Sequence, residues 1–366
     1  MNSEPLDLLR IPWIGVRDSS NQILHLDLAE ALERLGRGEE LRFTGLRSYQ
    51  HQAWFCFLVQ LAAMALERAG KTTLDHPAEA WRSYVSDLDP APTAFHLVVQ
   101  DLEKPAFFQP PVPEGALKAW RAEDHPDILS VLITAKNFDV KANGFSSLPS
   151  LEDWCFALIT LQTTEGFMGR GNYGIMRMNG GFASRPLIGL YPRLTWAERF
   201  RHDVEMLLAR VAAKRTDFGF HPEFGLPLAW CRPWGGEKEE CLKTGDLHPY
   251  VLEVCRRVRL TSSRLNDAKS LRIQAHVTAT KAARIDTGEQ GSNLGDPWTP
   301  IRRKDSAAFT VSSAGFNYRT VSKILFERGD YAPWDALEFR ATEGEPIYAF
   351  LQATARGQGK TGGYPE

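Results

Sequence analysis

Arginine, asparagine and tyrosine side chains gather among five glycines in one stretch of eighteen residues, Gly169–Pro186, which reads GRGNYGIMRMNGGFASRP. Glycine lets backbone amides approach a partner closely and reach positive φ. Arginine presents a fixed fork of donors to phosphate groups or base edges, and tyrosine offers a face on which a base can stack. This combination favours nucleic-acid binding, and the alternative is a tight structural turn beside a strand. We call Glu165–Pro186 the glycine loop; its candidate DNA-binding residues are Gly169, Arg170, Gly171, Asn172, Tyr173, Arg177, Asn179, Gly180 and Arg185.

Groups suited to catalysis are scattered by comparison. The histidines form no HxH or HExxH spacing, and the sequence contains no GxSxG elbow and no Walker loop. His202 and Asp203 form the dipeptide that ligates metal in some phosphohydrolases, but within an amphipathic helix this dipeptide is typical of a surface pair. The segment Gly357–Thr361 ends like a P-loop, yet position 354, where that motif needs glycine, is a threonine. We therefore expect no enzyme activity, no bound metal and no cofactor.

The charge balance makes any DNA binding depend on local loops. The chain has 366 residues, of which 43% are hydrophobic, and a formal net charge of −2. A near-neutral total excludes a uniformly basic nucleic-acid-binding surface. The five cysteines form no CxxC pair, which indicates reduced thiols and argues against zinc. No apolar run reaches the roughly 20 residues of a membrane span and no signal-peptide pattern opens the chain, so we expect a cytoplasmic protein.

The elements that must position these residues mix helical and strand periodicities. Apolar side chains at three- and four-residue steps predict a core helix over Tyr49–Ala69, capped by Ser48 and stopped by Gly70. A second buried helix, Leu151–Gln162, leads directly into the glycine loop. The other predicted helices are Leu28–Leu35, Ala78–Leu88, Trp196–Lys214 and a last helix at the end of the segment Trp334–Ala355. The predicted strands are Leu8–Val16, Ile23–Leu28, Leu129–Ile133, Leu187–Leu190 and several within Leu271–Val311, the last of them Phe309–Val311. This pattern predicts an α+β fold, one large mixed domain with short antiparallel sheets and amphipathic helices over residues 1–355, and a stub at 356–366.

The glycine loop resembles that of the CasA family, the large subunit of the type I-E CRISPR Cascade complex. Further segments resemble the family in the same order along the chain, so the resemblance covers nearly all of it. Lys104 and Phe138 stand where the family commonly has histidine. We find no counterpart of the family's C-terminal helical bundle, so we expect 356–366 to be a wedge or linker towards a bundle that is a separate subunit, is truncated or is replaced by another domain. The other matching segments are Leu8–Arg17, Lys104–Gln109, Thr134–Lys141, Trp230–Trp234, Glu253–Arg259 and Gly357–Tyr364.

The resemblance implies a role for each of four elements. The glycine loop would contact the protospacer-adjacent motif from the minor-groove side. A hairpin wedge would start strand separation, a lysine finger would reach the target strand, and a long loop would face the subunit that holds the guide RNA's 5′ handle. A frayed tail and a solvated loop are the alternatives for the wedge and the long loop. The candidates are Gln358, Lys360 and Thr361 for the wedge, Lys281 or Arg284 for the finger, and Lys136, Asn137, Phe138 and Lys141 for the partner loop.

The sequence therefore predicts a non-enzymatic subunit of an RNA-guided Cascade-type surveillance complex in antiviral defence. It would recognise the protospacer-adjacent motif of double-stranded DNA and help start the duplex opening that forms the R-loop. The implied partners are target double-stranded DNA, crRNA, the handle-binding and backbone subunits, and a helicase–nuclease effector, without a membrane. The alternatives are a stand-alone metal-dependent phosphohydrolase and a purely structural scaffold subunit.

Overall fold

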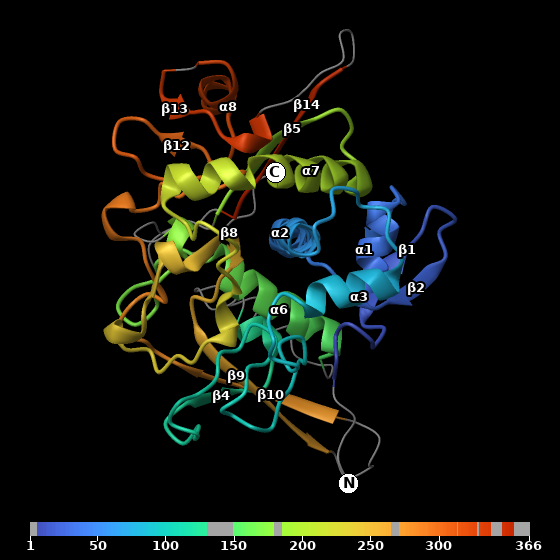
Figure 1. Cartoon of the computed structure of the whole chain (residues 1–366), viewed down its shortest axis with the longest axis vertical. Coiled ribbons are helices and arrows are strands. Elements are labelled where there is room, and N and C mark those ends of the chain that lie inside the picture. Colours follow the sequence, from blue (N-terminus) through green and yellow to red (C-terminus); the bar gives the residue numbers. More distant parts are fainter. Residues whose placement is uncertain are drawn as a thin grey trace.

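A buried helix, α2 (His51–Arg68), runs through the centre of the molecule (Figure 1). Every side chain of α2 from Gln52 to Leu66 is buried, which confirms the predicted core helix. Burial on all sides requires that other elements surround it. The computed structural model describes residues 6–129, 149–178, 185–264, 271–312, 314–327, 329–337 and 346–354.

The two ends of α2 differ in how well the sequence predicts them. The predicted cap is wrong, because Ser48 begins a separate 3-10 turn, η1 (Ser48–Gln50). Gln50 then occupies the N-cap position of α2 and makes no capping hydrogen bond with its side chain. Gly70 follows the helix at φ +65°, the left-handed conformation that favours glycine after a C-cap, as predicted.

Most of the remaining helices lie around α2 (Figure 1), whereas α8 lies apart from it beside β13. Helices α3, α6 and α7 pack on α2, and α1 packs against α3 and α7. Side chains of Asp27, Ser150 and Thr195 accept backbone hydrogen bonds at the starts of α1, α6 and α7. No helix within the described ranges combines the length and the apolar character that crossing a membrane requires. The bounds are α1 Leu28–Gly36, α3 Ala78–Ser86, α6 Leu151–Thr164, α7 Trp196–Phe218 and α8 Tyr318–Leu325.

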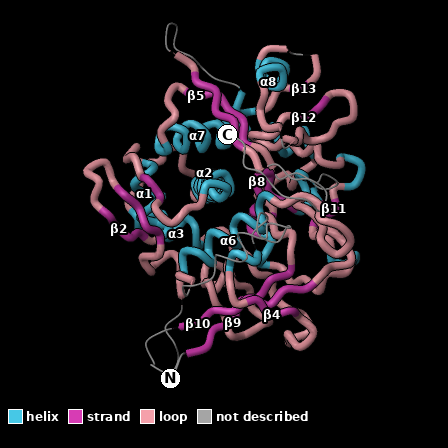
Figure 2. Tube along the Cα trace, turned by 180° about the vertical axis from the view of Figure 1, so that it is seen from behind, coloured by secondary structure: helices cyan, strands magenta, loops and turns pink. Residues whose placement is uncertain are grey.

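The strands form small separate sheets around the helices (Figure 2). Four groups pair antiparallel, as predicted: β2-β1-β3, β4-β10-β9, β5 with β14, and β12 with β13. Two pairs, β6 with β8 and β7 with β11, are parallel. The mixed α+β class is thereby confirmed. The strands are β1 Ile14–Arg17, β2 Ile23–Leu26, β3 Arg42–Phe43, β4 Arg121–Glu123, β5 Leu187–Tyr191, β6 Leu226–Leu228, β7 Leu242–Lys243, β8 Leu247–Leu252, β9 Arg257–Arg264, β10 Leu271–Thr278, β11 Ile285–Asp286, β12 Ile301–Arg302, β13 Tyr331–Ala332 and β14 Tyr348–Gln352.

Three local predictions are corrected by the structure. The first strand starts only at Ile14, because Leu8 instead donates its backbone N–H to Phe95 at 3.0 Å, outside that sheet. Phe309–Val311 forms no strand. The predicted last helix is strand β14, which pairs with β5 from Tyr348 to Gln352. Of the predicted strand Leu129–Ile133, only Leu129 is described, and it ends the 3-10 turn η2 (Pro126–Leu129).

Glu152, in the first turn of α6, joins that helix to the first sheet. Its Oε1 accepts the backbone N–H of Gly15 at 2.9 Å. The carboxylate fits because Gly45 has no side chain; a Cβ there would lie 2.2 Å from Oε2. Burial raises the pKa of Glu152 to about 7, and Asp153 adds to the rise, whereas the Gly15 hydrogen bond opposes it.

This raised pKa predicts a pH dependence of folding. A carboxyl whose folded pKa exceeds its unfolded value of 4.5 contributes stability that is present below pH 4.5 and is lost as the pH rises through about 7. We expect about 1–2 kcal/mol of the free energy of unfolding to be lost over this window, after allowing for solvent screening of a partly exposed group. Glu152→Gln should remove that slope in urea unfolding curves measured from pH 4.5 to 8, and Glu289→Gln, at an exposed site, should keep it. Unchanged slopes in Glu152→Gln would contradict this assignment.

Candidate nucleic-acid interface

The middle and the C-terminal end of the glycine loop are held by one buried cluster of charges. The loop leaves α6 and enters β5, and residues 165–178 and 185–186 of it are described. Arg177 donates to Glu253 Oε1 at 2.5 Å and to the Pro249 carbonyl at 2.9 Å. Arg185 and Arg177 both pair with Asp296 Oδ2, at 2.7 and 3.2 Å. Two arginines and two carboxylates therefore neutralise one another inside the protein.

The expected role of Arg177 and Arg185 as forks for DNA is corrected by this arrangement. Each side chain is only 1–2% exposed, and their guanidinium groups are committed to internal carboxylates. Burial alone would raise the pKa of Asp296, but Arg185 and Arg177 outweigh it and the pKa is lowered. Burial does raise the pKa of Glu253, against the pull of Arg177. These arginines fix the loop; they do not reach a surface partner.

The tip of the loop, Gly169–Tyr173, is a tight turn that does reach the surface. Gly169 and Gly171 have φ of +104° and +86°, which favour glycine. Asn172 donates its N–H to the Gly169 carbonyl at 2.9 Å, and its own carbonyl accepts from Met168 at 2.8 Å. The side chains of Arg170 and Asn172 are exposed at this turn. Of the expected contacts, these two are therefore displayed to solvent.

The tip is clamped onto the segment that follows β10. The Gly171 carbonyl accepts the N–H of Thr280 at 3.1 Å, and the hydroxyl of Tyr173 donates to the Lys281 carbonyl at 3.0 Å. Arg256 donates to the carbonyl of Tyr173 from the other side. A Cβ on Gly171 would lie 2.9 Å from Cβ of Ala279, so only glycine allows this approach. Tyr173 is half-buried and its hydroxyl is already used by the protein.

The two lysine-finger candidates have different surroundings. Lys281 is 75% exposed and pairs with Glu237 at 2.8 Å. Arg284 is buried: it donates to the carbonyls of Glu240 and Arg232 at 2.8 and 3.0 Å, and burial lowers its pKa to about 10. The structure therefore brings Lys281 beside the glycine loop and corrects the expectation for Arg284, which links two internal segments.

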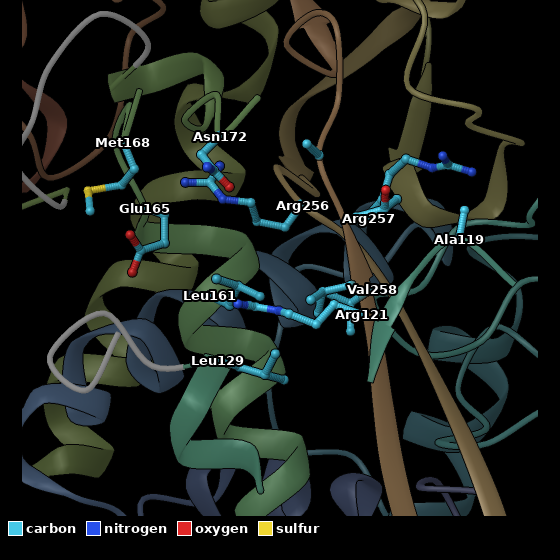
Figure 3. A pocket seen from close by; sticks show the side chains of 13 residues that line it. Ala119, Arg121, Leu129, Leu161, Glu165, Met168, Asn172, Arg256, Arg257 and Val258 are labelled. Atoms are coloured by element: carbon cyan, nitrogen blue, oxygen red, sulfur yellow. The ribbon is translucent and has the colours of Figure 1, made fainter. Parts of the chain in front are cut away.

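A cavity of about 570 Å³ opens beside the tip of the loop (Figure 3). Asn172 and Glu165 line it from the loop, Arg121 and Arg257 line it from the β4-β10-β9 sheet, and Arg256 lines it from the position just before β9. Arg121 is 71% exposed and pairs with Glu123 at 2.7 Å, whereas Arg257 pairs with Glu114 and stacks over Trp120. The sequence analysis missed Arg121, because only the pairing of β4 with β10 brings it here.

Nine of the predicted residues lie outside the described part of the chain. Their predicted roles in DNA contact by the glycine loop, as wedge and as partner loop stay predictions. They are Asn179, Gly180, Gln358, Lys360, Thr361, Lys136, Asn137, Phe138 and Lys141.

The His202–Asp203 pair has a structural explanation. Asp203 is fully buried and accepts hydrogen bonds from Tyr191 at 2.9 Å and from the Trp298 indole at 2.6 Å. His202 Nδ1 lies 3.0 Å from its other oxygen. Within the described ranges, no three His, Cys, Asp or Glu side chains gather in a way that could hold a metal ion. The arrangement gives no support to the alternative of a metal-dependent phosphohydrolase.

The fold is that of a class of CRISPR-associated proteins. The sequence matches no protein-family model and no curated protein. A CRISPR-associated protein from Thermus thermophilus is similar in structure with a TM-score of 0.59 at 16% identity, over 98% of this chain and 71% of that one. A chain of a CRISPR RNA-guided surveillance complex matches with a TM-score of 0.58 at 12% identity, over 99% of this chain and 75% of that one.

The particular protein whose fold this chain shares is Cse1, that is, CasA. Cse1 from Acidimicrobium ferrooxidans matches with a TM-score of 0.63 at 14% identity, over 100% of this chain and 70% of that one. Because the match spans the whole chain, it includes the segments that anchor the glycine loop. The resemblance seen in the sequence is thus confirmed at the level of the fold.

Proposed function

We propose that this chain is the large subunit of a Cascade-type RNA-guided surveillance complex and that its glycine loop reads the protospacer-adjacent motif of target DNA. The observation that carries the proposal is the combination of a Cse1 fold over the whole chain with a hydrogen-bonded tip, Gly169–Tyr173, that exposes the side chains of Arg170 and Asn172. Pre-organised backbone at a surface costs little ordering on binding. The role is recognition, and no catalytic step is assigned.

The chemistry of the tip suits a shallow, permissive reading of a duplex. Gly169 carries no side chain and lets the backbone come close to a groove, while Gly171 holds the turn against the segment after β10. Asn172 can donate and accept at base edges, and Arg170 can enter a narrow minor groove with its fork. The minor groove distinguishes mainly A·T from G·C pairs and shape. Pairing with the guide RNA would supply the rest of the sequence discrimination.

The surrounding cations provide phosphate contacts beside the tip. Lys281 lies on the segment hydrogen-bonded to Gly171, and Arg121 lines the neighbouring cavity. On binding, Lys281 and Arg121 would exchange their carboxylate partners, Glu237 and Glu123, for phosphates of the DNA. Gln358–Thr361 as wedge and Lys136–Lys141 as partner loop, facing crRNA and the handle-binding subunit, complete the proposal.

The direct test compares the assembled complex with and without this subunit. Target duplexes carry the guide's complement and a randomised flanking motif, and bound molecules are sequenced. We expect motif enrichment only with the subunit present, and weak binding by the isolated chain, because its net charge of −2 offers little non-specific phosphate attraction. Enrichment without the subunit would overturn the proposal. An assembly that needs the subunit but shows no motif preference would indicate a scaffold.

A substitution at Arg170 tests the proposed DNA contact of a single side chain. Arg170→Ala removes an exposed side chain without a structural partner among the described residues, so folding should be unchanged. We expect complex binding to a duplex with the preferred motif to weaken by about 1–3 kcal/mol, the range of one good base contact. Arg319→Ala, at an exposed position on α8, is the control and should leave affinity unchanged within about twofold. If Arg170→Ala and Arg319→Ala bind the duplex with equal affinity, Arg170 does not contact the DNA.

A further inference from the structure

A second, smaller cavity of about 180 Å³ lies between α2, α7 and β14. None of its lining residues lines the cavity beside the glycine loop. Its walls include Phe55 from α2, Trp196 from the start of α7 and Phe350 from β14, and Ser48 and His51 also line it. The residue that sets its chemistry is Arg199.

Arg199 is a buried cation surrounded by aromatic rings. Only 4% of the residue is exposed. Its guanidinium carbon lies 3.9 Å from the ring centre of Phe350, 4.6 Å from that of Phe55 and 5.5 Å from that of Trp196. Ring faces attract a cation and offset part of the loss of hydration. Rings accept no strong hydrogen bonds, so the five N–H donors of the guanidinium still need acceptors.

Within the described residues, no hydrogen bond from the Arg199 side chain and no ion pair to it is formed, and its Nε is buried without a partner. The nearest carboxylates are already engaged. Asp203 accepts from Tyr191 and Trp298. Glu40 accepts the backbone N–H groups of Trp196 and Ala197 at 3.2 and 3.3 Å. The cation therefore faces a cavity while every nearby counter-charge is held by other donors.

We propose that this cavity binds a small oxyanion, a carboxylate or a phosphate group, through the Arg199 fork. The guanidinium stays charged at neutral pH and matches both groups with two parallel hydrogen bonds. The volume lies below the roughly 300 Å³ at which drug-sized ligand pockets begin, so the cavity admits one anionic group and not a nucleotide. The site is independent of the proposed DNA contacts.

The experiment uses the full chain with inorganic phosphate or acetate as the probe, at constant ionic strength set with chloride. Isothermal titration and thermal unfolding measure binding. We expect one saturable site in the wild type for at least one probe. Saturation by phosphate alone identifies a phosphate site, and saturation by acetate alone identifies a carboxylate site. Either outcome, or saturation by each probe in turn, supports the proposal. No saturable binding of either probe overturns it.

Three variants assign the binding to Arg199. Arg199→Met should abolish it, and Arg199→Lys, which keeps the charge but loses the fork, should weaken it by at least about tenfold. Arg68→Met, which removes an exposed arginine stacked 5.0 Å from Phe224, is the matched control and should bind like the wild type. Ser48→Phe narrows the cavity without touching Arg199 and covers the case in which Arg199→Met does not fold. Unchanged binding in Arg199→Lys or in Ser48→Phe contradicts the assignment.

Discussion

Asp296→Asn is expected to lower the free energy of unfolding by about 3–5 kcal/mol, the cost of leaving a buried charge uncompensated. The Asp296 carboxylate pairs with Arg185 at 2.7 Å and with Arg177 at 3.2 Å, and it also accepts the N–H of Trp298 at 2.9 Å. An amide of the same shape keeps the space filled but removes the negative charge. Arg177 would retain Glu253, and Arg185 would be left with Gln60 and the face of Trp298. Urea unfolding followed by tryptophan fluorescence measures the change.

The control for this prediction is a surface pair of the same chemistry. Asp305 pairs with Arg302 at 2.9 Å, and both side chains are nearly half exposed. Asp305→Asn should change the free energy of unfolding by less than about 1 kcal/mol, because water screens such a pair and solvates either partner alone. If the two variants lose the same stability, the buried cluster does not hold the glycine loop in the way we describe.

Gly171→Val is expected to weaken binding of the assembled complex to a motif-bearing duplex by at least about tenfold, while costing about 1–3 kcal/mol of folding stability. Two effects combine at this position. A φ of +86° disfavours any side chain, and an added Cβ would lie 2.9 Å from Cβ of Ala279. The second effect pushes the loop away from the segment after β10 and breaks the hydrogen bond from Thr280. Gel-shift titration of the complex and thermal unfolding of the chain measure the two consequences.

Substitutions at two other glycines distinguish the effect of backbone strain from the effect of a lost DNA contact. Gly169 has φ of +104° and Gly288 φ of +55°, and an added Cβ would meet nothing within 4 Å at either site. Gly288→Ala should cost backbone strain with no loss of DNA binding, and Gly169→Ala should reduce binding less than Gly171→Val does. A collapse of thermal stability in Gly171→Val, with motif selectivity preserved in the complex that remains, would mean that the loop serves only the fold.

Local patterns were sufficient for most helices. The central helix was predictable because its apolar side chains recur at helical steps over five turns, and Gly70 marks its end. Strands were less predictable, because a strand is completed by a partner that lies elsewhere in the chain. The sequence pattern of β14 predicts a helix, but in the structure these residues form a strand because they pair with β5.

The sequence by itself determined the helical core, the mixed α+β class and a glycine loop rich in arginine. The tertiary structure alone decided which arginines are available to a partner. Arg170 and Arg177 both lie among the glycines of the same loop, yet Arg170 is exposed and the side chain of Arg177 is only 1% exposed. The difference is made by Glu253 and Asp296, more than seventy residues away in the chain. A buried guanidinium is tolerated only where carboxylates meet it, and that meeting depends on how distant segments pack.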